Sequence, residues 1–505
     1  MAGAADAEMA PREEELGAEA EGLADLLPLP PFSEGEGEAG EAAAGGKAQA
    51  RHLKRAQRRA EKARAREAHG RGRTRELRAL LDVLAALPGA VPALAAPAGR
   101  VEGPEGGERT PQQGRRSASA ALVDEEEVEK AVVAAEAVMR TGIQAYAELP
   151  QAFGPAEGIE ILAAMIDRPP KYQEKYLAQE LSLLAKVWAL AKGALPEGAM
   201  EGVDPDAPME QSPPGGRVAI VDIGAGNGCL ALLAAILLDG YAVLIDHTLP
   251  PKELRVEDKV PEPYRSRVLR INGDVADLDA WRHVVPLLQQ HGAVQAIVVA
   301  KHLCGVGTDL ALRLVQSWCG ESPREAAKDK GVDLVGAVFA TCCGHKIGAG
   351  DRESFASIHA GDKYLNGLTG SDPGRIRELL TLCTRCVAWR TTAGALGSRI
   401  TVPQVRAAEL FEDVLQQPRL NALRQLFPAA EEVAFVPRER SPQNRCLLAG
   451  SAPALRLAAG APGAEAALLR ALGAARGRLL AATGGAPVDL RPHGFVSTKY
   501  NYDGT

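Results

Sequence analysis

The sequence predicts an α/β fold built on a seven-stranded, mostly parallel sheet, preceded by helices and by a disordered N-terminal tail. From about residue 217, short apolar runs alternate with stretches of helical periodicity. The runs are continuously rich in Val, Ile and Leu, as strands of a sheet buried on both faces are. The first 120 residues are instead rich in Ala, Gly, Glu and Arg, a composition that does not bury a large core.

Composition divides the 505-residue chain into four parts. Residues 1–120 form a low-complexity tail whose one helical segment, 47–87, begins with a basic block. Residues 121–200 are helical, 215–450 form the α/β domain, and 451–505 are an Ala/Gly-rich C-terminal extension. We expect the tail to be dispensable for folding, because it lacks a periodic apolar pattern outside its one helix.

Charge is segregated within the tail. Residues 1–46 carry twelve acids and one arginine, whereas 47–78 carry thirteen Lys or Arg and three Glu. A basic block of this kind binds nucleic acid or serves as a nuclear address. It is also consistent with a solvated helix that the acidic residues neutralise, so both interpretations stay open.

Other features limit the class of protein. No apolar run is long enough to span a membrane, and the N-terminus lacks a basic-then-apolar signal pattern. Eight cysteines in 505 residues do not indicate a disulfide scaffold. We therefore expect an intracellular, soluble protein, and the sequence does not distinguish nucleus from cytoplasm.

The expected elements follow in order along the chain. A helix is expected from Asp124, where acids favour an N-terminus, and another after Pro170, where Leu177, Leu181 and Leu184 share one stripe. The expected strands are VAIVDIG at 218, YAVLID at 241, RVLRING at 267, VQAIVVA at 294, VDLVGAVFA at 332, EEVAFVP at 431 and NRCLLAG at 444. The last two are expected to form an antiparallel edge pair.

A glycine-rich turn ends the first expected strand, with the sequence Asp222-Ile-Gly224-Ala-Gly226-Asn-Gly228. Glycines at the carboxyl end of a strand let the chain turn tightly and let a ligand touch the backbone. The second strand ends in Asp246, 18 residues after Gly228, a position suited to holding ribose hydroxyls.

The third strand ends in Asp274, where an acid often holds an adenine amino group in methyltransferases but is also an ordinary turn residue. Cys229 and Leu230 stand where a dinucleotide fingerprint has its third glycine. This spacing favours S-adenosyl-L-methionine, which has no pyrophosphate to bind, over NAD. Together with seven expected strands in this order, the spacing predicts a Rossmann-like methyltransferase fold.

Reactive side chains follow the fourth and fifth strands. They are Lys301, His302 and Cys304 after the fourth, and Cys342, Cys343 and His345 after the fifth. Substrates of open α/β sheets lie beyond the carboxyl ends of the strands, so we expect these groups to face one. Thr308 or Asp309 is expected to cap the next helix, although Asp309 is also a catalytic candidate.

The segment KHLCGVGTDLALR, from Lys301, resembles the signature of the eukaryotic tRNA 2′-O-methyltransferases that modify nucleotide 4 of the acceptor stem. KYQEKYLAQELSLLAKV, from Lys171, is similar to the helix before that family's cofactor strand. LCTRCVAWRT, from Leu382, resembles its segment ending in a Trp-containing turn, and SPQNRCLLAG, from Ser441, its closing strand. The resemblance covers roughly residues 168–450 and implies tRNA as the partner.

The implied reaction is methyl transfer from S-adenosyl-L-methionine to a ribose 2′-hydroxyl. That hydroxyl is a poor nucleophile, so a base or a cation that stabilises the developing alkoxide should help. Lys301 can serve either role, and His302 is the other candidate base.

Two departures from the family pattern bear on the substrate. No cysteine precedes Cys229, whereas the family usually carries N-terminal Cys/His zinc modules. The family's CCHHRC motif reads CCGHKI from Cys342. A broader set of methyltransferases shares a His-x-Cys-Gly motif and a later Cys-Cys pair. A protein or small-molecule substrate, and a non-catalytic RNA-binding relative, therefore stay alternatives.

Metal binding is not predicted, although the residues for it exist. Cys304, Cys342, Cys343 and His345 could converge on a zinc ion, and the CTRC segment from Cys383 offers another pair of thiols. Adjacent cysteines rarely both bind one ion, and CTRC on a helix would face the core.

Overall fold

The computed structural model describes residues 77–78, 80–81, 84, 125–141, 155–194, 217–301, 303–320, 331–341, 343–392 and 400–491. All of them belong to one compact unit that begins at His69. The predicted acidic tail, most of the basic block, the end of the chain after residue 491, and the predicted site residues His302 and Cys342 lie outside the described residues.

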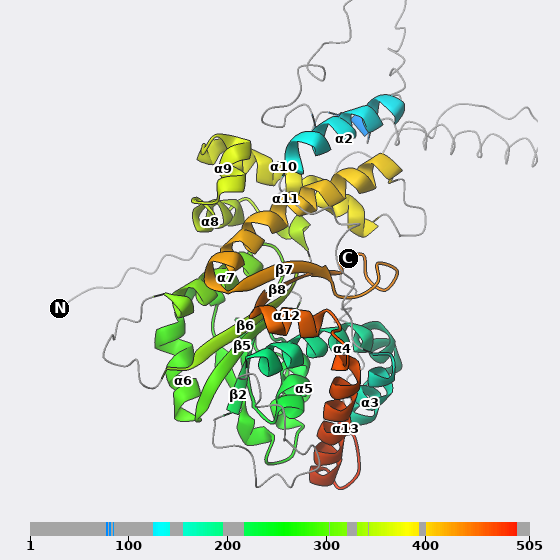
Figure 1. Ribbon diagram of the computed structural model, residues 1–505, viewed down its shortest axis with the longest axis vertical. Helices are drawn as coiled ribbons and strands as arrows, with labels where there is room; N and C mark the ends of the chain where they lie inside the picture. The colour runs from blue at the N-terminus through cyan, green and yellow to red at the C-terminus, as the bar shows by residue number, and fades with distance from the viewer. Residues whose placement is uncertain are drawn as a thin grey trace, which may run out of the picture. The chain divides into compact units, whose positions relative to one another are not determined.

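A seven-stranded sheet forms the centre of this unit, as the sequence predicts (Figure 1). Its strands are β2 (Arg217–Ile223), β3 (Tyr241–Asp246), β4 (Val268–Asn272), β5 (Ala293–Lys301), β6 (Asp333–Thr341), β7 (Ala429–Ala434) and β8 (Arg445–Gly450). They lie in the order β4-β3-β2-β5-β6-β8-β7. β8 pairs antiparallel with both β6 and β7, so β8 alone of the seven runs against the rest.

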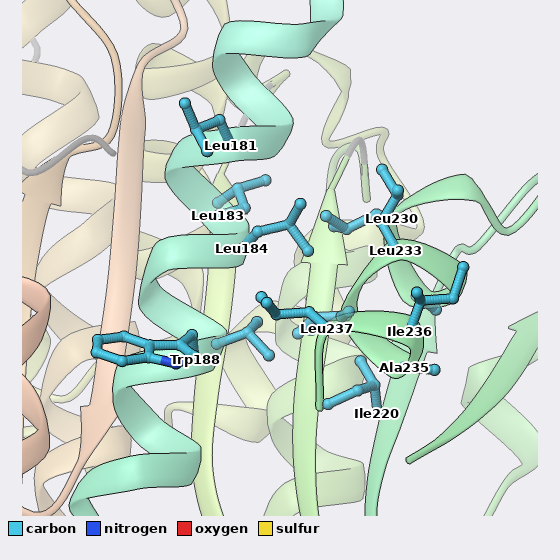
Figure 2. Packing of buried hydrophobic residues seen from close by; sticks show 14 of the residues in the cluster. Leu181, Leu183, Leu184, Trp188, Ile220, Leu230, Leu233, Ala235, Ile236 and Leu237 are labelled. Carbon is cyan, nitrogen blue, oxygen red and sulfur yellow. The ribbon is translucent and has the colours of Figure 1, made fainter. Parts of the chain in front are cut away.

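Five helices cover one face of the sheet (Figure 1). They are α3 (Glu157–Met165), α4 (Pro170–Gly193), α5 (Cys229–Leu238), α12 (Ala452–Ala458) and α13 (Ala464–Ala482). α5 has the sequence CLALLAAILL and is apolar all round, as a helix enclosed between a sheet and other helices is. Figure 2 shows Leu184 of α4 pointing toward Leu230 and Leu233 of α5.

Two further helices and the end of a third cover the opposite face. They are α6 (Val285–Gln290), α7 (Gly307–Cys319) and the last turns of α11 (Val402–Leu426). Short 3-10 turns at Lys252–Leu254, Val256–Asp258, Arg265–Arg267, Val275–Asp277 and Gly344–Lys346, and a π-helical turn at Ala280–Val284, connect the strands.

Strand residues divide between the two faces by parity. In β5, Ile297 and Val299 pack with α4 and α5, whereas Val298 and Ala300 pack with α6 and α7. Successive side chains of a strand point to opposite faces, so each face receives every second residue. The continuous apolar runs predicted this two-sided burial.

A third core is mostly helical and includes the first turns of α11. It contains α2 (Glu125–Met139), α8 (Asp351–Ile358), α9 (Lys363–Thr369) and α10 (Pro373–Thr392). LCTRCVAWRT lies inside α10, so Trp389 is helical and the turn expected there from the family resemblance is wrong. The predicted helical segment 121–200 is likewise divided, because α2 joins this core whereas α3 and α4 join the sheet.

The end of the predicted tail is part of this helical core. Leu77, Leu80 and Leu84 are at most 2% exposed and pack in the same cluster as Val128 and Val132 of α2. Their spacing of three and four residues places them on one helical face. This packing argues against the expectation that all of residues 1–120 is dispensable for folding.

The predicted boundary at residue 450 does not end the folded unit. Ser451 accepts a hydrogen bond from the Ala454 amide and donates one to the Gly193 carbonyl of α4, at 2.9 Å. Leucines of α13 enter the core beneath α3 and α5, and β9 (Val488–Asp489) pairs in parallel with β1 (Ile166–Asp167). Although this segment is rich in Ala and Gly, the leucines of α13 form an apolar stripe that packs into the core on one side of the sheet.

No helix in the described part of the chain is long and apolar enough to cross a membrane.

Candidate active site

The glycine-rich turn follows β2 directly, and its three glycines have different surroundings. Gly224, Gly226 and Gly228 all have positive φ, which side-chain-bearing residues rarely adopt. A Cβ at Gly224 would lie 2.9 Å from Leu303, and one at Gly228 would lie 2.4 Å from Leu244. A Cβ at Gly226 would meet no described atom within 4 Å. Gly226 is therefore where a ligand can approach the backbone.

Asp246 ends β3 beside this turn. Its carboxylate accepts the Gly226 amide at 2.8 Å and the Thr248 amide at 2.9 Å. The side chain is 14% exposed, and each carboxylate oxygen has a second lone pair. The acid therefore holds the glycine turn in place and keeps acceptor capacity on its exposed side.

Arg270 of β4 supports the same turn from the other side. Its guanidinium donates to the Gly226 carbonyl at 3.0 Å and pairs with both carboxylate oxygens of Glu257. A bidentate pair of this kind fixes the direction of the guanidinium plane. Neither residue was predicted from sequence, although Arg270 is the one charged residue within β4.

Asp222, one residue before the end of β2, is 3% exposed. Burial raises its pKa to about 7, while the nearby charge of Lys301 acts in the opposite direction. Asp274 has a different setting: it is exposed, and its carboxylate accepts the Ala276 amide at the start of a 3-10 turn. Asp274 therefore makes the ordinary turn contact that the sequence also allowed.

Lys301 is the last residue of β5, and its side chain lies beneath α4. It is 10% exposed, its Nζ lies 3.6 Å from Oε1 of Glu180, and it sits 4.7 Å from the ring centre of Tyr176. Burial lowers the pKa of Lys301, partly offset by the Glu180 carboxylate. Glu180 also pairs with both terminal nitrogens of Arg168, so one acid is shared between two cations.

Glu180 and Arg168 were missed from sequence, although a signal for Glu180 exists. It stands three residues after Leu177 and four before Leu184, on the apolar stripe that faces the sheet. A carboxylate on such a stripe requires a buried cation as partner. Parity in β5 then places Lys301 on the same face as Ile297 and Val299, toward α4.

Asp309 does not face the candidate site. It is fully buried in the first turn of α7, accepts both Nε and a terminal nitrogen of Arg419 at 2.8 and 2.7 Å, and lies 2.8 Å from Nε2 of His359. Burial alone would raise the pKa of Asp309, but Arg419 and His359 outweigh it and lower the pKa. Its predicted role as a helix cap is wrong, because a core arginine takes its lone pairs. This buried pairing gives no support to its predicted catalytic role.

Thr308 does not cap α7 either. Its hydroxyl donates to the Leu303 carbonyl at 3.2 Å, and the residue at the cap position is Val306, which offers no side-chain acceptor. This hydrogen bond therefore closes the turn from Leu303 to Thr308 that leads into α7.

The predicted Cys/His cluster is described in part. Cys304 and Cys343 are half-buried, and the Gly305 amide donates to the Cys343 carbonyl at 3.3 Å, so the turns after β5 and β6 are in contact. His345 Nδ1 is buried without a hydrogen-bond partner among the described residues. Within the described ranges no three His, Cys, Asp or Glu side chains are arranged to hold a metal. Cys342 lies outside those ranges.

Cys383 and Cys386 are fully buried in α10, on its face toward the helical core. Burial raises the pKa of both thiols well above the ordinary value. Both thiols pack with the apolar side chains of this core. The expectation that CTRC lies on a helix facing the core is confirmed.

The strand order, the glycine turn after the first strand of the sheet and the acid after the second together define a Rossmann-like methyltransferase. The family model described as Methyltransferase TRM13 matches residues 211–395, which include the glycine turn, Lys301 and the CCGHKI segment. Over these residues the match confirms the resemblance to that methyltransferase family, and it includes the KHLCGVGTDLALR and LCTRCVAWRT segments. No curated protein matches the chain.

Proposed function

We propose that this protein transfers a methyl group from S-adenosyl-L-methionine to the ribose 2′-hydroxyl of nucleotide 4 in the acceptor stem of tRNA. The observation that carries the proposal is the family match over residues 211–395. Every residue proposed below to act in catalysis or to hold the cofactor falls inside that match.

The residues around the glycine turn fit the cofactor. Open space at Gly226 admits a ligand to the backbone, and the remaining lone pairs of Asp246 suit the two hydroxyls of a ribose. Asp222 lies on the same side of the sheet and suits a nearby positive group, since a buried carboxylate gains from a cation. The cofactor, when bound, supplies an electrophilic methyl group on a sulfonium. Asp274 stays a proposed contact to adenine.

Methyl transfer requires a proton to leave the 2′-hydroxyl as the oxygen–carbon bond forms and the sulfur–carbon bond breaks. We assign this proton to Nζ of Lys301, whose lowered pKa makes the neutral amine more accessible than in an exposed lysine. Glu180 and Tyr176 hold that amine near the carboxyl end of β5. His302 is the alternative base, and alignment of the two reactants contributes a further part of the rate.

The test is transfer of a radiolabelled methyl group from S-adenosyl-L-methionine to total tRNA, followed by nucleoside mapping. A 2′-O-methylated nucleoside at position 4 is the expected product. Label on a base or at another position would overturn the assigned target. Label that appears only on protein or small molecules in a lysate would favour the broader methyltransferase set.

A protein that binds the cofactor in a thermal-shift titration but transfers no label would be the non-catalytic relative. The matched negative control is Gly226→Arg, which places a side chain in the open space beside the turn.

A further inference from the structure

The buried cluster of Asp309, Arg419 and His359 is not used by the mechanism above, yet it contacts the backbone of the candidate site. Asp309 and Arg419 form a bidentate pair, and each is at most 2% exposed. The same terminal nitrogen of Arg419 that contacts Asp309 also donates to the Gly305 carbonyl at 3.3 Å. Arg419 thus connects α11 to the turn that follows Lys301.

Gly305 is the contact between two turns of the site. Its amide donates to the Cys343 carbonyl, and the Lys346 amide donates to the same carbonyl at 2.9 Å. The φ of Gly305 is +63°, and a Cβ there would lie 2.8 Å from the Lys346 carbonyl oxygen. The turn after β5 therefore fits against the turn after β6 only with glycine at this position.

Three features orient the Arg419 guanidinium. Asp309 fixes its plane, His359 occupies the free side of the Asp309 carboxylate at 2.8 Å, and the Phe355 ring lies 5.7 Å from the guanidinium carbon. A bidentate pair with a carboxylate fixes the orientation of the guanidinium plane. The N–H group that donates to the Gly305 carbonyl is therefore held in a fixed direction. Removing one partner of a buried pair of this kind would leave the other charge uncompensated.

We propose that Asp309 and Arg419 are positioning residues for methyl transfer: Asp309 orients Arg419, and Arg419 holds Gly305, so that the turns after β5 and β6 keep their reactive side chains in place. The kinetic part of this inference rests on the proposed function. The structural part does not, because it concerns the two turns themselves.

The test uses Arg419→Lys, which keeps the charge beside Asp309 but loses the planar fork that reaches Gly305. Gly305→Ala disturbs the same contact from the other side and leaves the buried pair intact. The matched control is Arg267→Lys, since Arg267 is also a buried arginine paired with an acid, Asp239, but lies where β4 begins.

Two readouts separate the inference from the proposed function. Hydrogen exchange of peptides spanning 303–307 and 343–347 should quicken by roughly 10-fold in Arg419→Lys and Gly305→Ala, and not in the control. Single-turnover methyl transfer should fall by roughly 10-fold or more in both, with cofactor affinity within about twofold of wild type.

Unchanged hydrogen exchange in both turns would overturn the inference that Arg419 holds Gly305 in place, whatever the methyl-transfer activity of the wild type. Faster exchange with an undiminished transfer rate would overturn the positioning role. A wild-type protein without any transfer to tRNA would refute the proposed function, while the exchange experiment would still decide whether Arg419 holds the turns.

Discussion

Asp222 and Lys301 stand on neighbouring strands and point to the same face of the sheet, beneath α4. Both side chains are ionisable and buried away from water, so burial raises the pKa of Asp222 and lowers the pKa of Lys301. Glu180 and Arg168 supply the opposite charges that make this burial tolerable. Single residues in this cluster are therefore expected to affect pH dependence more than packing.

The first prediction concerns the cofactor acid. Asp246→Ala should weaken S-adenosyl-L-methionine binding by roughly 1–3 kcal/mol in calorimetry, since a partly buried hydrogen-bond acceptor is lost. Asp246→Asn keeps one acceptor for the Gly226 amide and should lose less. Asp277→Ala removes an exposed acid from the turn after β4 and serves as the control. Equal affinity in Asp246→Ala, in Gly226→Arg and in wild type would remove the proposed cofactor site.

The second prediction concerns Lys301. Lys301→Ala should lower single-turnover transfer by roughly 10²-fold, with cofactor binding and melting temperature nearly unchanged, because Glu180 keeps Arg168 as its partner. Lys301→Arg should fail almost as badly, because arginine does not give up its proton. The wild-type rate should rise with pH as the amine becomes neutral. If Lys301→Ala reacts normally while Cys343→Ala is inactive, the CCGHKI segment carries the chemistry instead.

The third prediction concerns stability and pH. The folded pKa of Asp222, about 7, lies above its unfolded value, so the folded state holds the proton more tightly. Stability from this group is present below about pH 4 and is lost as the pH rises to about 7, by up to about 4 kcal/mol. Asp222→Asn should flatten the fall in melting temperature between about pH 4 and 7. A mutant curve parallel to wild type would contradict the raised pKa.

At the scale of elements, helices distant in the sequence complete each core. Leu77, Leu80 and Leu84 pack with α2, whereas α12 and α13 pack with α3, α4 and α5. Arg445 of β8 pairs with Asp413 of α11 and Glu432 of β7, and Arg390 of α10 pairs with Glu412 of α11. The helical core is thereby attached to the sheet through buried ion pairs, which break at high cost when one partner is removed.

The fourth prediction follows from the helical core. A chain beginning at residue 69 should unfold at nearly the wild-type denaturant concentration, because it keeps the three buried leucines. A chain beginning at residue 121 should lose at least about 3 kcal/mol, since it exposes the apolar surface they cover. Leu80→Ala in the full chain should cost roughly 2–5 kcal/mol by leaving a cavity. Identical unfolding midpoints for the two truncations would refute this packing.

The fifth prediction belongs to the whole molecule and concerns tRNA binding. Removing residues 1–68 deletes nine of the thirteen basic residues of the block while keeping the folded unit. If the block contacts RNA, tRNA affinity should fall and the slope of log affinity against log salt should flatten, because fewer counterions are released. The control replaces the basic residues of 47–66 with Gln in the full chain. An identical salt slope would leave the block as an address or a solvated helix.

Much of this architecture was predictable from sequence, because local patterns encode it. Continuous apolar runs predicted all seven strands of the main sheet, and the KHLCGVGTDLALR segment indicated the family resemblance that the match over residues 211–395 bears out. The glycine turn and Asp246 were placed correctly beside each other, since both follow the carboxyl ends of adjacent parallel strands. These features depend on residues close in the chain or on strand order, which the sequence carries directly.

The tertiary structure alone decided which charges meet. Asp309 is paired with Arg419, 110 residues away, and Lys301 with Glu180, which lies before the first strand of the main sheet. The Asp309–Arg419 pair has no local signature, and the position of Glu180 on an apolar stripe indicates only that a buried cation is needed, because a buried charge is satisfied by whichever opposite charge the packing brings to it. The same reason explains why stretches outside the predicted boundaries at residues 120 and 450 pack into the cores. The apolar stripes of Leu77–Leu84 and of α13 are buried by helices distant in the sequence, so the local pattern alone does not show that they belong to a core.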